Sequence, residues 1–344
     1  MIRFECDYLE GAHPRILQRM METNLEQNPG YSMDPHCERA RELIRQACGC
    51  PEAAVHFLVG GTQANTIVIA SILRPHQGAL CAVTGHINAH ESGAIEATGH
   101  KVLALPSADG KITAAQVQRA VDDHFGDETH EHIVQPGMVY ISFPTENGTL
   151  YSRAELKELY AVCQKNGLPL FIDGARLGYG LATPENDLTL ADMARLCDVF
   201  YIGGTKVGAL FGEAVVIANP AYAADFRYLI QQRGGMLAKG RLLGIQFETL
   251  FEDGLYMQIS AHAIEQARRL REGFQKLGCA FRYDSPTNQL FPILTRAQYD
   301  KLAEQFAFSF WEKVDEEHVA VRFCTSWATL PQNVDALLEA LKTL

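Results

Sequence analysis

The stretch "LPLFIDGARLGYG", residues 168–180, joins an apolar run to a cluster of polar side chains. Residues 170–172 have the composition of a buried strand, yet the run ends on the carboxylate of Asp173, and the guanidinium of Arg176 follows three residues later. In an open α/β sheet, ligands bind where the carboxyl ends of strands meet the following loops. We therefore predict a functional site at this sheet edge, with a simple helix cap at Asp173 as the alternative.

Apolar segments alternate with helical patterns on both sides of this stretch. Short apolar runs predict strands at 53–59, 80–84, 102–106, 137–143, 168–173 and 197–203. Helical patterns occupy 36–47, 62–73 and 152–167, and the last begins with Ser152 and Glu155, a pair typical of a capping box. This alternation predicts an α/β fold, a mostly parallel sheet covered by helices.

The pattern changes after about residue 245. A long helix is predicted over 256–278, followed by short strands around Cys279–Asp284, Gln289–Thr295 and His318–Cys324. The sequence therefore predicts two domains: a large α/β domain with an N-terminal arm, residues 1–245, and a smaller C-terminal α+β domain, residues 246–344.

Composition excludes several classes of function. The 344 residues are 47% hydrophobic and 21% charged, which supports a sizeable packed core. A net charge of −11 argues against partners such as nucleic acid or an anionic membrane surface. The apolar runs are too short for a membrane span, and the first residues lack the pattern of a signal peptide.

The cysteines and histidines do not form a recognisable metal motif. Nine cysteines are scattered without a C-x-x-C pair, so we expect free thiols in a reduced, cytoplasmic protein. His86 and His90 are four residues apart, but their order is not that of H-E-x-x-H. The sequence therefore predicts no metal site.

Two further strand ends carry residues suited to chemistry. In "FLVGGTQANTIVIA", residues 57–70, an apolar run passes through two glycines into a helix, which predicts a cradle of amides for a phosphate. A plain tight turn is the alternative there. In "DVFYIGGTKVGALFG", residues 198–212, Lys206 follows a strand among small and apolar residues. Desolvation would make such a lysine nucleophilic, whereas an ordinary surface lysine is the alternative.

Together these three motifs match what pyridoxal phosphate (PLP) requires. A phosphate cradle, a lysine for covalent attachment and an acid facing the ring nitrogen would converge at one sheet edge. Asp173 would stay ionised beside the protonated ring nitrogen, and Arg176 would bind an α-carboxylate with two hydrogen bonds.

The sequence resembles the L-threonine aldolase / aromatic amino acid beta-eliminating lyase family of fold-type-I PLP-dependent enzymes. The resemblance extends from "FECDY" to "VRFCTSW", and "GGTQAN", "DGAR" and the lysine after "GGT" are its most specific parts. It implies a fold-type-I PLP-dependent transferase-like fold with PLP as cofactor. The cofactor-binding residues that it implies are Gly61, Thr62, Gln63, His86, Asp173 and Lys206, with Lys239 or Arg241 reaching the phosphate from a neighbouring subunit.

The resemblance also implies how the substrate is bound. It places Arg176 and Arg322 on the carboxylate and Tyr31 near the site across a subunit interface. Cys6 stands where the family often has a serine, and Glu146 where many members have a histidine. These departures fit phenylserine-like substrates as well as threonine. A homodimer or homotetramer with the site at the subunit interface is implied, without nucleic acid or membrane partners.

The predicted activity is cleavage of a β-hydroxy-α-amino acid to glycine and an aldehyde. Lys206, His86, Asp173 and Glu146 are the predicted catalytic residues. Glu146 ends a predicted strand in a polar turn, where it could act as general base or merely face water. Beta-elimination or transamination on the same fold, and a non-catalytic phosphate- or nucleotide-binding protein, remain alternatives.

Overall fold

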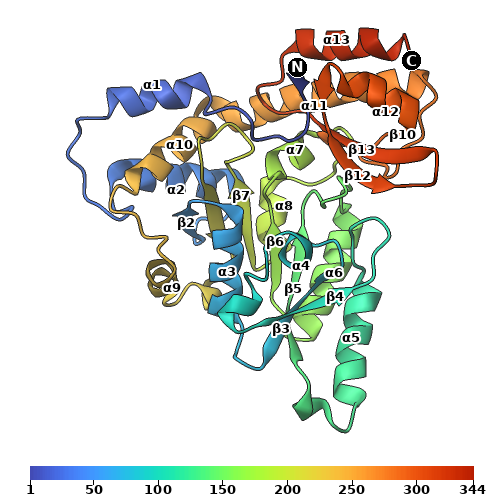
Figure 1. The fold of residues 1–344 in the computed structure, drawn as a ribbon. Helices are drawn as coiled ribbons and strands as arrows, with labels where there is room; N and C mark the ends of the chain where they lie inside the picture. Colours follow the sequence, from blue (N-terminus) through green and yellow to red (C-terminus); the bar gives the residue numbers. More distant parts are fainter.

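A computed structural model describes all 344 residues, and its centre is a seven-stranded sheet (Figure 1). The strand order is β2-β8-β7-β6-β5-β3-β4. Strands β4, β3, β5, β6 and β7 pair in parallel, and β8 is antiparallel to both of its neighbours. The strands are β2 (Ala54–Leu58), β3 (Gln77–Ala82), β4 (Lys101–Leu105), β5 (Gln135–Ser142), β6 (Leu170–Asp173), β7 (Val199–Gly203) and β8 (Glu213–Ile217).

The predicted strands of this sheet are confirmed, and one strand was missed. Strand β8 starts on an acidic residue, Glu213, directly after a glycine-rich stretch, so its short apolar run was not separated from the preceding loop. Its insertion between β2 and β7 is the only departure from a fully parallel sheet.

Helices cover both faces of the sheet, as predicted. One face packs against α3 (Gly61–Ile72) and α9 (Phe226–Gln232). The other face packs against a larger apolar cluster contributed by α2 (Pro35–Cys48), α5 (Ala114–Gly126), α6 (Arg153–Lys165), α7 (Leu177–Ala182), α8 (Leu190–Arg195) and α10 (Arg241–Phe251). The predicted capping box is present at the start of α6, where Ser152 and Glu155 hydrogen-bond each other's backbone amides.

Alternation along the strands decides which polar side chains face α3. Phe171, Tyr140, Tyr201 and Val215 all belong to the apolar cluster on the α3 side. Side chains two residues apart on a strand share a face, so Asp173 and Glu213 point to this side as well. The strands thus place their polar ends under the N-terminus of α3.

The C-terminal unit is built on a small antiparallel sheet. Strand β13 (His318–Cys324) pairs with β10 (Ile293–Thr295), β12 (Ser309–Lys313) and β9 (Gln289–Leu290). Helices α11 (Leu255–Lys276), α12 (Arg296–Ala303) and α13 (Pro331–Leu341) pack around it. The strand predicted at 279–284 is wrong: only Phe281 makes a bridge, to Pro292, and the rest of the segment is bent or irregular backbone.

The N-terminal arm reaches the C-terminal unit. Strand β1 (Ile2–Arg3) pairs in parallel with β11 (Phe306–Ala307). In Figure 1 the blue N-terminus accordingly lies beside the red C-terminal unit. The arm continues through α1 (Pro14–Glu22) toward α2. The predicted domain boundary at 245/246 falls inside α10 and stays a prediction.

The remaining elements are short. Helix α4 (His86–Ala89) follows β3, and single 3₁₀ turns occupy Glu96–Thr98, His130–His132, Pro220–Tyr222 and Glu252–Gly254. No helix combines the length and the apolar character that crossing a membrane would require.

Candidate active site

The polar ends of the central strands open into one cavity of about 340 Å³. Its walls come from the start of α3, the turn after β3, the ends of β5, β6 and β7, and the start of β8. Seven of the residues predicted from the sequence line it: Gly61, Thr62, His86, Glu146, Asp173, Arg176 and Lys206.

Asp173 is a buried carboxylate held by four donors. Its Oδ2 accepts hydrogen bonds from Tyr140 Oη (2.6 Å) and Asn65 Nδ2 (3.1 Å). Its Oδ1 accepts from Tyr201 Oη (2.5 Å) and from the backbone N–H of Ala175 (3.0 Å). Burial acts to raise the pKa of Asp173, but the charge of His86 and these hydrogen bonds outweigh it, so the pKa lies below its usual value. Asp173 therefore stays ionised although it is buried.

His86 is oriented by a second acid. Its Nδ1 lies 2.7 Å from Oε1 of Glu91, and the same oxygen accepts a hydrogen bond from Asn65 Nδ2 at 2.6 Å. Burial lowers the pKa of His86, but Glu91 and Asp173 more than offset this and raise it. Asn65 thus links the acid that holds His86 to the acid at the end of β6.

Lys206 is the only lysine that lines the cavity. No carboxylate lies within ion-pair distance of its Nζ, and the ring of Tyr8 is 6.0 Å away. Burial, followed by the charge of Arg176, lowers the pKa of the Lys206 amine below its usual value. A larger fraction of neutral, nucleophilic amine is the consequence.

The N-terminus of α3 offers free backbone donors to the cavity. Gly60 precedes the helix and no side chain caps it, so the first amides point into the cavity without a partner from the chain. A Cβ atom at Gly61 would lie 2.9 Å from Tyr201 Oη, which requires glycine at this position. The side chain of Gln63 turns away, bonded to the Val59 amide and the Arg233 carbonyl.

Arg176 is held by a carboxylate from the N-terminal arm. Its Nε and Nη2 donate to Oδ2 and Oδ1 of Asp7 at 2.6 and 2.9 Å, and Asn288 Nδ2 donates to Oδ2 at 2.9 Å. Burial acts to raise the pKa of Asp7, but Arg176 and its neighbours lower it to about 2. One edge of the guanidinium is thus fixed, and its Nη1 remains free for a ligand.

Glu146 lies at the opposite wall, after the end of β5. Its Oε1 accepts hydrogen bonds from the backbone N–H of His86 (2.8 Å) and from Ser142 Oγ (2.6 Å). Burial raises the pKa of Glu146 above its usual value. The carboxyl group can therefore exchange a proton closer to neutral pH than an exposed glutamate can.

Six predicted residues do not line the cavity, namely Gln63 and the five described here. Arg322 lies on β13, where it bonds Gln289 and the Glu5 carbonyl and stacks on Trp311. Arg241 donates to backbone carbonyls of residues 23, 24 and 26. Cys6 is a free thiol beside Asp7. Tyr31 and Lys239 are exposed, so any part that they play needs a second subunit.

Several residues of the cavity or of its supporting network were not predicted from the sequence: Asp7, Tyr8, Asn65, Tyr140, Ser142, Tyr201 and Glu213. Tyr201 lies in the middle of β7 and Glu213 begins β8, so the only signal for each was a polar group in or beside an apolar run. Asp7 lies in the "FECDY" segment of the resemblance, but its contact with Arg176 was not predicted, because its partners lie far away in the sequence.

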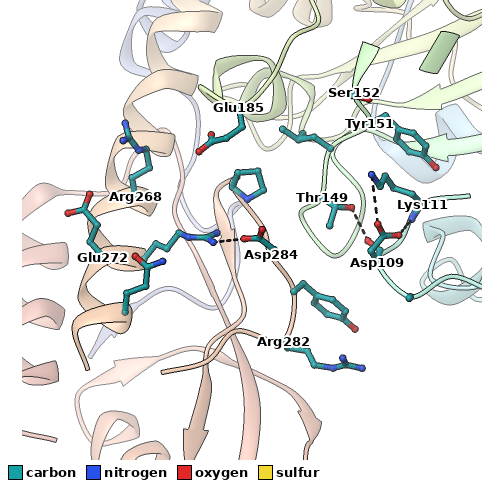
Figure 2. A pocket seen from close by; sticks show the side chains of 16 residues that line it. Asp109, Lys111, Thr149, Tyr151, Ser152, Glu185, Arg268, Glu272, Arg282 and Asp284 are labelled. Carbon is teal, nitrogen blue, oxygen red and sulfur yellow. Dashed lines mark hydrogen bonds and ion pairs between the residues drawn. The ribbon is translucent and has the colours of Figure 1, made fainter. Parts of the chain in front are cut away.

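A larger cavity, of about 740 Å³, lies elsewhere, between the large and the C-terminal units. Figure 2 shows its walls, in which Lys111 lies beside Asp109. Arg271 forms an ion pair with Asp284 in the same walls. Four basic residues (Lys111, Arg268, Arg271, Arg282) face four acidic ones (Asp109, Glu185, Glu272, Asp284). Because these charges balance and no predicted site residue lies here, size alone does not make this cavity the functional site.

Comparison with known proteins identifies the family of the chain. A protein-family model described as beta-eliminating lyase matches residues 4–297. The chain belongs to this family. The resemblance seen in the sequence is thereby confirmed.

Several similar proteins have the same name, low specificity L-threonine aldolase. The low specificity L-threonine aldolase of Pseudomonas aeruginosa is 28% identical over 343 residues, which cover 99% of this chain and 97% of that protein. The Saccharomyces cerevisiae enzyme of the same name is 27% identical, covering 82% and 72%.

Solved structures give the same result and define the fold. The threonine aldolase of Leishmania major is 45% identical, covers 100% of this chain and 99% of its own, and superposes with a TM-score of 0.97. Histidinol-phosphate aminotransferase from Clostridium acetobutylicum is only 14% identical but has a TM-score of 0.74. The predicted fold-type-I architecture is confirmed.

Proposed function

We propose that the protein is a PLP-dependent aldehyde-lyase that cleaves L-threonine-like or phenylserine-like β-hydroxy-α-amino acids to glycine and an aldehyde. The observation that carries the proposal is the convergence of Asp173, Lys206 and the uncapped start of α3 in one cavity. The family match and the names of the relatives support it.

The residues present fit PLP. The free amides at Gly61 and Thr62 suit a phosphate, and an ionised Asp173 suits a protonated ring nitrogen. When bound, PLP supplies an electron sink for the pair of electrons released at Cα. Lys206 would hold the cofactor covalently, and His86 would lie against its ring.

The other side chains would bind the substrate and move its protons. The free Nη1 of Arg176 would bind the carboxylate, and Arg322 would add a second positive charge from β13. Glu146 would accept the proton of the β-hydroxyl group, because carbon–carbon cleavage requires that proton to leave.

A panel of β-hydroxy amino acids, assayed for glycine and for aldehyde, tests the proposal. Equimolar glycine and aldehyde from threonine or phenylserine would support it. Release of ammonia and a keto acid would instead indicate elimination. A protein that stays colourless after PLP is added would indicate a phosphate- or nucleotide-binding protein.

Asp173→Asn is expected to slow cleavage by about 10²–10³-fold, because a neutral amide cannot stabilise the charge on the ring nitrogen. The fold and binding of PLP should be retained, since the amide can still accept hydrogen bonds from Tyr201. Steady-state kinetics and PLP titration check this together. Turnover near that of the parent enzyme would refute the role of Asp173.

Arg176→Lys is expected to raise KM for the amino acid about 10–100-fold, because the variant loses one charge-assisted hydrogen bond to the substrate. The lysine keeps the charge but cannot reach both Asp7 and a substrate with a planar fork. Arg268→Lys, at the exposed wall of the cavity in Figure 2, is the matched control and should leave KM unchanged. An unchanged KM in Arg176→Lys would move the carboxylate site elsewhere.

We also propose that two or four copies assemble in a reducing, cytoplasmic location. The N-terminal arm exposes apolar side chains, among them Met21, Leu25 and Met33 at 80%, 90% and 64%. All nine cysteines are free. Light scattering of the purified protein tests the assembly, and a monomer at micromolar concentration would refute it.

A further inference from the structure

Glu213 is an acidic side chain of the cavity to which the proposed function gives no part. It begins β8, is 4% exposed and lines the cavity with Lys206 and Thr62. In the sheet it lies opposite Leu58 of β2 on one side and Gly203 of β7 on the other. Because β2 leads to the start of α3 and β7 leads to Lys206, the register places Glu213 between the phosphate cradle and the lysine.

The contacts of Glu213 leave its charge uncompensated. Its Oε2 accepts a hydrogen bond from the backbone N–H of Gly204 at 3.0 Å, and it is absent from the ion pairs of the structure. Burial raises the pKa of Glu213 to about 8, although Thr205 and Lys206 act in the opposite direction. The group therefore gains or loses a proton within an accessible pH range.

The surroundings of Glu213 show what would decide its protonation. Lys206 follows β7, Tyr201 lies within β7, and Asp173 ends β6, the next strand of the sheet. His86 and Arg176 face the same cavity. The β2–α3 side, residues 59–62, contributes amides and no ionisable side chain. A phosphate bound there would add negative charge beside Glu213 without a cationic side chain of this chain at the cradle.

We propose that Glu213 is a positioning residue whose protonated carboxyl group donates a hydrogen bond to the phosphate of the cofactor, so that binding at alkaline pH takes up one proton from solvent. In the absence of the cofactor the same group is protonated at neutral pH and ionises only at about pH 8 and above. A carboxylate can only accept hydrogen bonds, whereas its protonated form can donate one. The inference rests on the proposed function, because it assumes PLP as the ligand.

The test compares the dissociation constant of PLP for the parent protein and for E213Q between about pH 6 and about pH 9.5. Glutamine keeps the oxygen that accepts from Gly204 and always offers N–H donors, but it cannot ionise. The two proteins should bind PLP similarly at the acid end. Above about pH 8 the affinity of the parent should fall relative to E213Q by about tenfold per pH unit, the slope for uptake of one proton.

Pyridoxal, which lacks the phosphate, is the matched control ligand, and the two proteins should then show the same pH profile. Parallel profiles with PLP would overturn the inference, as would a difference that persists with pyridoxal. Should E213Q fail to fold, calorimetry of the parent in buffers of different ionisation enthalpy decides the matter. At about pH 9 it should show about one more proton taken up with PLP than with pyridoxal, and equal uptake would overturn the inference.

These outcomes are distinct from a failure of the proposed function. If the parent protein bound no PLP at any pH, the proposed function would fall and this inference with it. If PLP bound but β-hydroxy amino acids were not cleaved, only the proposed reaction would fail, and the pH profiles would still test Glu213.

Discussion

Replacement of Lys206 by alanine is expected to reduce cleavage of β-hydroxy amino acids by about 10⁴–10⁶-fold, the range seen when a covalent nucleophile is removed. The cavity contains no second lysine that could take its place. Covalent attachment of PLP, fixed by borohydride reduction, should disappear in the same variant. Peptide mapping of the reduced parent protein should find the label on Lys206.

Lys101→Ala is the control for this experiment, because Lys101 is an exposed residue at the start of β4, outside the cavity. It should retain both the activity and the borohydride-fixed label. A label on Lys239 in the parent protein, or a label that survives in Lys206→Ala, would show that the attachment site has been assigned wrongly.

Glu146→Gln is expected to slow release of aldehyde by about 10²–10⁴-fold, the usual range for loss of a general base. Exchange of the α-proton of glycine with solvent should be largely retained, because that reaction involves no β-hydroxyl group. The glutamine oxygen can still accept from the His86 amide and Ser142 Oγ, so the local structure should be kept. Comparing the two reactions distinguishes a role of Glu146 in removing the hydroxyl proton from a role in maintaining the structure of the site.

The pH dependence gives a second measure of Glu146. A base acts only when deprotonated, and burial raises the pKa of this carboxyl group. The cleavage rate of the parent should therefore fall as the pH decreases through that raised pKa, and the fall should be absent in Glu146→Gln. Glu52→Gln, at an exposed glutamate outside the cavity, should behave like the parent. Equal losses in cleavage and exchange would contradict the role as base.

The central sheet could be predicted from the sequence because its strands are short, apolar and bounded by glycine or polar residues. Because the ends of these strands were visible in the sequence, Asp173, Lys206 and the start of α3 could be predicted to lie at one edge of the sheet without knowledge of tertiary contacts. Strand β8 was not predicted because it begins with a charged residue, Glu213. For the same reason Glu213 was not included in the predicted site.

Other features depend on contacts between distant segments. Nothing near Asp7 in the sequence indicates that it holds Arg176, because the guanidinium and Asn288 reach it from elsewhere in the fold. The predicted strand at 279–284 failed for the opposite reason: its local composition was suitable, but only Phe281 finds a pairing partner. A local sequence pattern forms a strand or helix only where a neighbouring element packs or pairs with it.

The pairing of β1 with β11 has a consequence for synthesis of the protein on the ribosome. Asp7 depends on Asn288, which is 281 residues further along the chain, and Ser309 bonds the carbonyl of Glu5 across 304 residues. Most of the large sheet can form while translation continues, since domains generally fold as units during synthesis. The arm that steadies Arg176 has no docking place until the C-terminal unit has emerged. We therefore expect a nascent chain with a finished sheet to lack a steadied Arg176, and hence tight substrate binding, until the C-terminal unit has been made.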